Sequence, residues 1–101
     1  MIPEPFGAYR STDYFNSEEM KRGIWDNTAV LWLILPAAEV AERPDIQFLV
    51  IGRPGVDGIE FGYRLGHDGI WAYRPIENTF LFLAPTVAAF LEGWRLHEIT
   101  V

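Results

Sequence analysis

Residues 46–74 decide the fold, and they read IQFLVIGRPGVDGIEFGYRLGHDGIWAYR. This stretch contains three apolar runs, 46–52, 59–65 and 70–74, which two glycine-rich turns separate. The second run alternates, and its apolar positions are Ile59, Phe61, Tyr63 and Leu65. Alternation with a period of two is typical of a strand that buries one face. Three strands at such short spacing predict an antiparallel meander.

The residues before the meander predict a strand, two short helices and an irregular arm. Residues 17–23 carry a serine cap, two glutamates in the first turn and a final glycine, and they predict a short helix. The apolar run 29–35 predicts a strand buried on both faces, and residues 37–43, between two prolines, predict a second short helix. Residues 1–16 predict an arm that its aromatic side chains pin to the body. These side chains are Phe6, Tyr9, Tyr14 and Phe15.

The residues after the meander predict three more elements. Residues 79–84 form a strand candidate, 87–92 a helix that Gly93 stops, and 94–101 a short final strand. With the earlier elements, this predicts a single α+β domain over residues 1–101. We expect a mostly antiparallel sheet of about four to six strands, flanked by short helices.

The composition excludes several function classes. Half of the 101 residues are apolar, which suits one folded domain and excludes a disordered tail. The absence of cysteine excludes disulfide scaffolds, cysteine-bound zinc and thiol nucleophiles. The first residues lack the layout of a signal peptide, and the longest apolar run, 29–38, has about half the length of a membrane span. We therefore expect a soluble cytoplasmic protein without a membrane partner.

The charge balance bears on the choice of partner. The net charge is −6, from 14 acidic and 8 basic residues. Nucleic-acid binding usually needs a basic face, and the scattered arginines predict none, so we expect no nucleic-acid partner. An acidic domain suits a basic protein partner, because complementary fields speed encounter. The alternative is that the charge only keeps the protein soluble.

Motifs for catalysis and cofactor binding are weak in this sequence. Gly52, Gly55 and Gly58 lack the spacing of a nucleotide-binding loop, and a predicted strand follows them, so a turn explains them better. The other candidates are pairs of titratable residues: His67 with Asp68, His97 with Glu98, Glu39 with Glu42, and Asp57 with Glu60. None has the spacing of a metal motif, and solvated carboxylates do no acid–base work. We expect no enzyme activity, no metal and no cofactor.

Aromatic residues are the remaining candidates for a binding surface. Trp71 and Tyr73 occupy alternate positions of a predicted strand, so they share one face, with Ile70 and Ala72 on the other. Tryptophan, tyrosine and arginine dominate the hot spots of protein interfaces. The alternative is that large aromatics fill the core, and we assign Trp32, in the most apolar run, to that role.

From residue 46 onward, glycines and apolar pairs follow an ordered pattern. Its positions are Ile51-Gly52, Gly55, Gly58, Ile70-Trp71 and the stretch from Leu83-Ala84 to Phe90-Leu91. Upstream, Leu31-Trp32 followed by PAAEV at 36–40 is similar to an L-W-x-P-E-E-L step. The pattern resembles the SUKH superfamily, which includes fungal cell-wall-synthesis regulators and many bacterial immunity proteins. The resemblance covers residues 29–94. A short N-terminal region, residues 1–28, and Thr86-Val87 in place of Ser-Phe mark a trimmed or divergent member.

The resemblance implies an α+β fold and a non-enzymatic role, which in bacterial members is the neutralisation of a toxin, often a nuclease, by direct binding. We therefore expect a protein-binding module whose acidic face mimics the substrate of a basic toxin. The residues expected to contribute are Asp57, Glu60, Trp71, Tyr73 and Arg74. The alternative is a regulatory or scaffolding domain that binds an endogenous protein or forms a homodimer. A small hydrolase that uses His67 or His97 is the third hypothesis.

Overall fold

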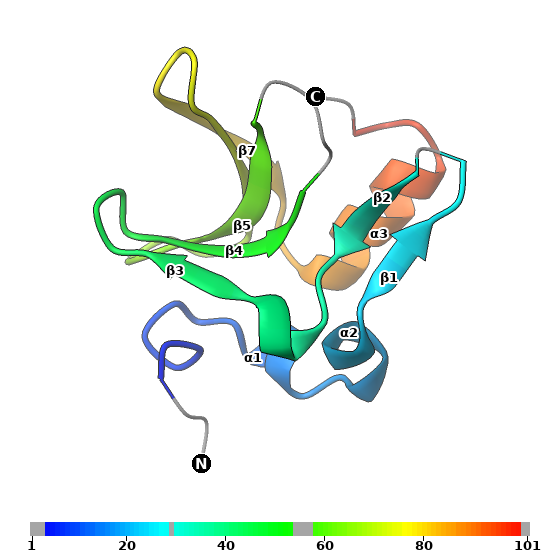
Figure 1. Ribbon diagram of the computed structural model, residues 1–101, viewed down its shortest axis with the longest axis horizontal. Coiled ribbons are helices and arrows are strands. Elements are labelled where there is room, and N and C mark those ends of the chain that lie inside the picture. Colours follow the sequence, from blue (N-terminus) through cyan, green and yellow to red (C-terminus); the bar gives the residue numbers. More distant parts are fainter. Residues whose placement is uncertain (1–3, 29, 54–57, 100–101) are drawn as a thin grey trace.

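The chain folds into two antiparallel sheets and a few short helices (Figure 1). The computed structural model describes residues 4–28, 30–53 and 58–99. The larger sheet has five strands in the order β3 (Ala41–Arg43), β4 (Phe48–Gly52), β5 (Glu60–Arg64), β6 (Ile70–Arg74), β7 (Thr79–Ala84). The smaller sheet pairs β1 (Ile24–Asp26) with β2 (Leu31–Ile34). The helices are α1 (Thr12–Phe15), α2 (Glu18–Arg22), the 3₁₀ helix η1 (Ala37–Glu39) and α3 (Val87–Arg95). The predicted α+β class with a mostly antiparallel sheet is confirmed.

β2 and β3 pair in succession along the same edge of β4. The N–H of Arg53, just beyond β4, donates to the carbonyl of Trp32 at 3.1 Å. Nearer the start of β4, Val50 lies opposite Ala41 of β3. η1 occupies the gap between the two pairings. The smaller sheet is therefore linked to the larger one through the end of β4.

The predicted helix over residues 37–43 is wrong. Only Ala37–Glu39 turns, as a 3₁₀ helix, and Ala41–Arg43 is a strand. Alanine and glutamate favour a helix locally, but the edge of β4 offers backbone partners that outweigh this preference. Glu39 and Glu42 consequently lie on different elements rather than on one helix.

β2 matches the predicted apolar strand only in part. Leu33 and Ile34 are buried, as expected for the core. The sequence assigns Trp32 to the core, but it is only half-buried and packs at the margin of a smaller apolar cluster. Its ring packs edge-on against Trp25 of β1, 5.4 Å between centroids. β1 itself was not predicted, because its three residues show no period.

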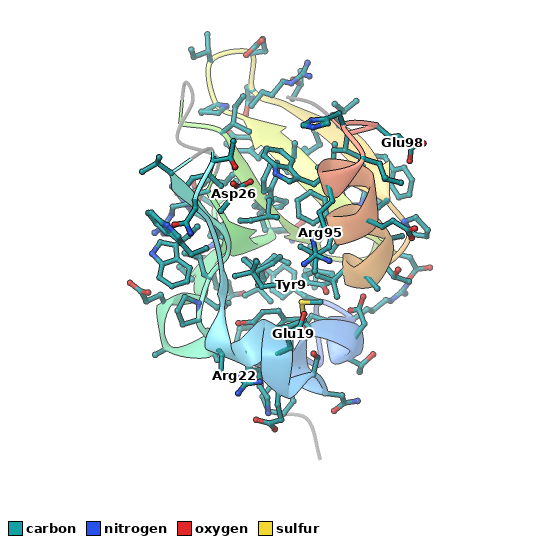
Figure 2. All side chains as sticks on the ribbon, turned by 90° about the vertical axis from the view of Figure 1, so that its right-hand side faces the viewer. Tyr9, Glu19, Arg22, Asp26, Arg95 and Glu98 are labelled. Carbon is teal, nitrogen blue, oxygen red and sulfur yellow. The ribbon has the colours of Figure 1, made fainter. Side chains whose placement is uncertain are left out.

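The N-terminal helices and α3 cover one face of the larger sheet, which we call the covered face. Figure 2 looks onto this side of the molecule, with α3 in front. Phe61 of β5 meets Phe90 of α3 at 4.8 Å between ring centroids, and Trp94 at 5.6 Å. Strand residues buried in this cluster include Leu49, Ile51, Phe61, Tyr63, Ile70 and Ala72. This cluster is the main hydrophobic core.

The N-terminal arm is tied to the core by aromatic side chains, as predicted, but the expectation that residues 1–16 are irregular is wrong at Thr12–Phe15, which form α1. Tyr14 is fully buried, and its hydroxyl donates to the carbonyl of Leu35 at 2.8 Å. Tyr9 donates to the carboxylate of Glu42 at 3.0 Å. Burial raises the pKa of Tyr14 to about 12. Burial also raises the pKa of Tyr9 to about 12, with a further contribution from the Glu42 carboxylate.

Asp13, in α1, connects the arm to both the sheet and α3. Its carboxylate accepts from the hydroxyl of Tyr63 at 2.7 Å and from the N–H of Val87 at 2.8 Å. Val87 is the first residue of α3, where a negative charge suits the helix dipole. Burial, and then the nearby charge of Asp13, raise the pKa of Tyr63. The arm therefore helps to fix the position of α3.

Helix ends agree with the sequence at one helix and disagree at another. Ser17 caps α2 through its side chain and Gly23 follows its last residue, as predicted. The predicted stop at Gly93 is wrong, because α3 continues through it. A Cβ at Gly93 would lie 2.6 Å from Cδ1 of Ile99, so this glycine allows close packing.

The predicted final strand is also wrong within the described residues, since 96–99 contain no strand. No helix of the described residues is long and apolar enough to cross a membrane.

Candidate binding face on the open side of the sheet

The second face of the larger sheet is not covered by α1, α2 or α3, and we call it the open face. No residue of α1, α2 or α3 belongs to the apolar cluster on this side. In Figure 1 the β3–β4 and β6–β7 hairpins project to the left, and α3 lies on the right. Strand alternation and register assign the following residues to the open face: Phe48, Val50, Glu60, Gly62, Arg64, Trp71, Tyr73, Phe80 and Phe82.

Aromatic rings pack against one another across the strands of the open face. Tyr73 lies 5.0 Å from Phe80 between centroids, and Phe48 lies 5.5 Å from Phe80. Trp71 meets Phe82 edge-on at 5.2 Å. Phe48 is fully buried, whereas Phe82 is 50% exposed. The cluster is therefore closed over β4 and open to solvent over β7.

Arg64 lies over the open part of this cluster. Its guanidinium carbon is 4.6 Å from the ring centre of Trp71 and 4.1 Å from that of Phe80. Both distances lie within the range of cation–π attraction, which holds the guanidinium against the rings. In the part of the chain that the structure describes, no carboxylate forms an ion pair with Arg64. Its planar set of donors matches the geometry of a carboxylate.

Glu60 lies on the same face, at the start of β5. Its side chain is only 6% exposed, and its carboxylate accepts from Arg43 at 2.8 Å and lies 3.6 Å from Nε of Arg53. The hydrogen bond to Glu60 and the charge of Glu60 raise the pKa of Arg43. Among the described residues, Arg43, Arg53 and Arg64 lie on or beside this face with one buried glutamate, and the charge of Asp45 in the β3–β4 turn also acts on Arg43. The described part of the face therefore has a small positive excess, although the whole chain has a net charge of −6.

The structure brings together only part of the set expected from the sequence. Trp71 and Tyr73 share one face of the sheet, as their spacing predicted, and both are half-buried there. The expectation that Glu60 offers an exposed acid is wrong, because two arginines close over its buried side chain. Arg74 ends β6, and alternation assigns it to the opposite face from Trp71 and Tyr73. Asp57 lies outside the described residues.

Sequence reasoning missed Arg64, Phe80 and Phe82 on the open face, and also Arg43 and Arg53, which pair with Glu60. The signal that could have found the two phenylalanines is an F-x-F at 80–82 beside a W-x-Y at 71–73. The hairpin register places Phe82 opposite Trp71 and Phe80 opposite Tyr73. The register depends on the turn between the strands, and alternation alone does not supply it.

In the described structure, His67 and its sequence neighbour Asp68 contact other residues rather than each other. Asp68 pairs with Arg10 at 3.0 Å. The ring of His67 lies edge-on to Trp71 at 5.6 Å, and His97 lies in the turn after α3. Among the described residues, no group of three or more histidine, aspartate or glutamate side chains is placed to hold a metal ion.

A separate groove of about 540 Å³ lies where β7 runs into α3. Its lining is apolar apart from Glu92 and Glu98. The groove lacks the aromatic and arginine side chains of the open face. The open face is therefore the stronger candidate for recognition.

Comparisons with known proteins give no neighbour for this chain. No family model matches it. No curated protein and no solved structure matches it either. The resemblance to the SUKH superfamily stays a prediction, and the functional conclusion rests on the geometry of the open face.

Proposed function

We propose that this chain is a non-enzymatic protein-binding module and that the open face is its binding surface. The observation that carries the proposal is a set of partly exposed aromatic rings with Arg64 lying over them. Large aromatics and arginine are the residues that most often dominate binding energy. Apolar groups left exposed side by side mark interaction surfaces on soluble proteins.

The charges of the open face indicate what chemistry the partner would present. Arg64 has no carboxylate partner in the described part of the chain, and Arg43 and Arg53 together outnumber Glu60. A segment with a carboxylate among apolar side chains would complement this surface. The carboxylate would accept two hydrogen bonds from the Arg64 guanidinium, and the apolar groups would pack on the exposed rings of β7.

The SUKH resemblance supports a toxin domain as the partner, bound in the cytoplasm. The mechanism differs from the mimicry expected from the sequence, because two arginines neutralise Glu60. In our proposal the toxin supplies the carboxylate, and this chain supplies the aromatic and arginine surface. Neutralisation would then follow from steric cover of the toxin.

Single-stranded nucleic acid is the competing class of ligand, because aromatic rings and arginine also stack on bases. Two features favour protein. Arg43 and Arg53 are already paired with Glu60, so few charges remain to follow a phosphate backbone. The net charge of −6 also repels a polyanion at a distance.

Panning a phage-displayed random peptide library against the purified protein tests the proposal. We expect the enriched peptides to combine acidic and apolar residues, and to bind Arg64→Gln at least about tenfold more weakly. The matched control is Arg95→Gln, because Arg95 lies on the α3 side of the sheet (Figure 2). A failure to enrich peptides, equal binding to both variants, or tighter binding of an oligo-dT strand would overturn the proposal.

A regulatory or scaffolding domain that self-associates is the second candidate. The observation that favours it is the uncharged edge strand β7, which is independent of the charges on the open face.

A further inference from the structure

The two edges of the larger sheet are built differently. β3, at one edge, has three residues and carries Glu42 and Arg43, and Pro44 follows it. Short length, charge and proline are the features with which natural sheets prevent edge-to-edge pairing. β7, at the other edge, has six residues, TFLFLA, without a charge or a proline. One edge is thus protected against pairing and the other is not.

The outer side of β7 has no backbone partner among the described residues. β6 is its only neighbour in the strand order. Within residues 4–28, 30–53 and 58–99, no backbone hydrogen bond of a turn, loop or cap involves residues 79–84. Leu81 and Phe82 are 38% and 50% exposed. The edge therefore presents backbone donors and acceptors without a protein partner together with exposed apolar side chains, a combination that offers a template for pairing with another strand.

We propose that β7 pairs with β7 of a second copy of this chain, in an antiparallel dimer with two-fold symmetry. Such an axis, perpendicular to the sheet, keeps each face continuous, so residues that lie opposite each other must belong to the same face. Pairing centred on Leu81 meets this condition. It places Leu81 opposite its own copy and Phe80 opposite Phe82 on the open face. Aromatic pairs directly across two strands stabilise a sheet.

The sequence of β7 fits a second copy better than an unrelated strand. Because β7 carries no charge, its self-pairing brings no like charges opposite each other. Phe80 and Phe82 belong both to the edge and to the open face, so two five-stranded sheets would become one sheet with a continuous aromatic surface. The dimer would then display two open faces side by side. This inference does not depend on which ligand the open face binds.

Sedimentation velocity of the full chain over a range of concentrations measures the association directly. We expect a mass that rises from 11.6 kDa toward twice that value. We also expect the dissociation constant to fall as salt is added, because screening weakens the repulsion between two copies of charge −6. Leu81→Lys, which sets two cations opposite each other, should raise the dissociation constant at least about tenfold. Ile76→Lys is the matched control, since Ile76 is 73% exposed in the turn before β7.

A charge-swap mixture separates loss of pairing from loss of folding. Leu81→Lys and Leu81→Glu should each be monomeric, with the circular dichroism and melting temperature of the parent. Mixed in equal amounts, they should associate again, because the register places residue 81 opposite its copy. A parent chain that stays at 11.6 kDa at every concentration, or a dimer that Leu81→Lys leaves intact, overturns the proposal. Loss of the dimer without recovery in the mixture overturns the register on which it rests.

Discussion

The covered face and the open face belong to the same sheet, yet they end in different environments. On β6 the contrast appears between neighbouring residues: Ile70 and Ala72 are fully buried, whereas Trp71 and Tyr73 are half-buried. The first pair packs in the cluster that α3 covers, whereas the second pair belongs to a smaller cluster that includes no residue of α1, α2 or α3. Alternation assigns a residue to a face, but the elements packed on that face decide whether it becomes core or surface.

Phe90→Ala tests the covered face and should have the largest effect. Phe90 is fully buried and packs against Phe61 at 4.8 Å, so we expect a loss of about 3–5 kcal/mol in the free energy of unfolding. Urea denaturation followed by circular dichroism measures it. Leu96→Ala is the control, because Leu96 is 59% exposed after α3 and should change stability by less than about 0.5 kcal/mol. Equal losses in the two variants would break the comparison between buried and exposed positions.

Asp13→Ala tests how the arm holds α3 on the covered face. The change removes the acceptor of the Tyr63 hydroxyl and of the Val87 N–H, so we expect a loss of about 2–3 kcal/mol. Asp13→Asn keeps one acceptor oxygen and should lose less. Denaturation midpoints of the two variants provide the measurement. An Ala variant as stable as the parent would show that the arm does not anchor the helix.

Alkaline pH should weaken the covered face through its tyrosines. The pKa of Tyr9 and of Tyr14 is raised from 10 to about 12, and that of Tyr63 is raised in the same direction. The folded state therefore keeps protons that the unfolded state releases above pH 10. This part of the stability is fully present below pH 10 and is lost as the pH rises through 12. For Tyr14 the rise of the pKa from 10 to about 12 corresponds to about 2–3 kcal/mol of stability.

Unfolding free energies between pH 8 and 12, with tyrosinate absorbance recorded in parallel, measure this loss. Tyr14→Phe is the matched variant, and its stability should decline less steeply above pH 10. A parent profile that stays flat to pH 12 would contradict the raised pKa values.

Phe82→Ala tests the open face and should have the smallest effect on stability. Phe82 is half exposed, so we expect a loss below about 1 kcal/mol. The affinity for an enriched peptide should nevertheless fall, because the ring is part of the proposed contact surface. Fluorescence anisotropy with a labelled peptide provides the second measurement. A stability loss close to that of Phe90→Ala would show that the open face behaves as core.

The meander could be read from the sequence because local signals determine it. Turn residues bound each run, and the predicted strand over 79–84 agrees with β7 at both ends. The predicted helix over 37–43 failed because the edge of β4, which is distant in the sequence, supplies partners for Ala41–Arg43. The prediction that Gly93 stops the last helix also failed because of a contact outside the local pattern. Ile99 packs where a side chain at position 93 would lie, so the glycine serves packing inside the helix rather than ending it.

The candidate site could be read only in part. The spacing of Trp71 and Tyr73 placed them on one face, and the structure confirms that they share it. The buried state of Glu60 depends on Arg43 of β3. The position of Arg64 depends on the rings of Trp71 on β6 and Phe80 on β7. Such contacts follow from register and from burial, neither of which a single strand encodes.

Amide chemical-shift mapping of an enriched acidic peptide, titrated into the isotope-labelled chain, tests the central claim most directly. If the open face is the binding surface, the largest shifts should fall on Ile70–Arg74 and Thr79–Ala84, and Arg64→Gln should reduce them while Arg95→Gln leaves them unchanged. Shifts that instead cluster on α3 and around the groove at its end would contradict the account and assign recognition to the covered side.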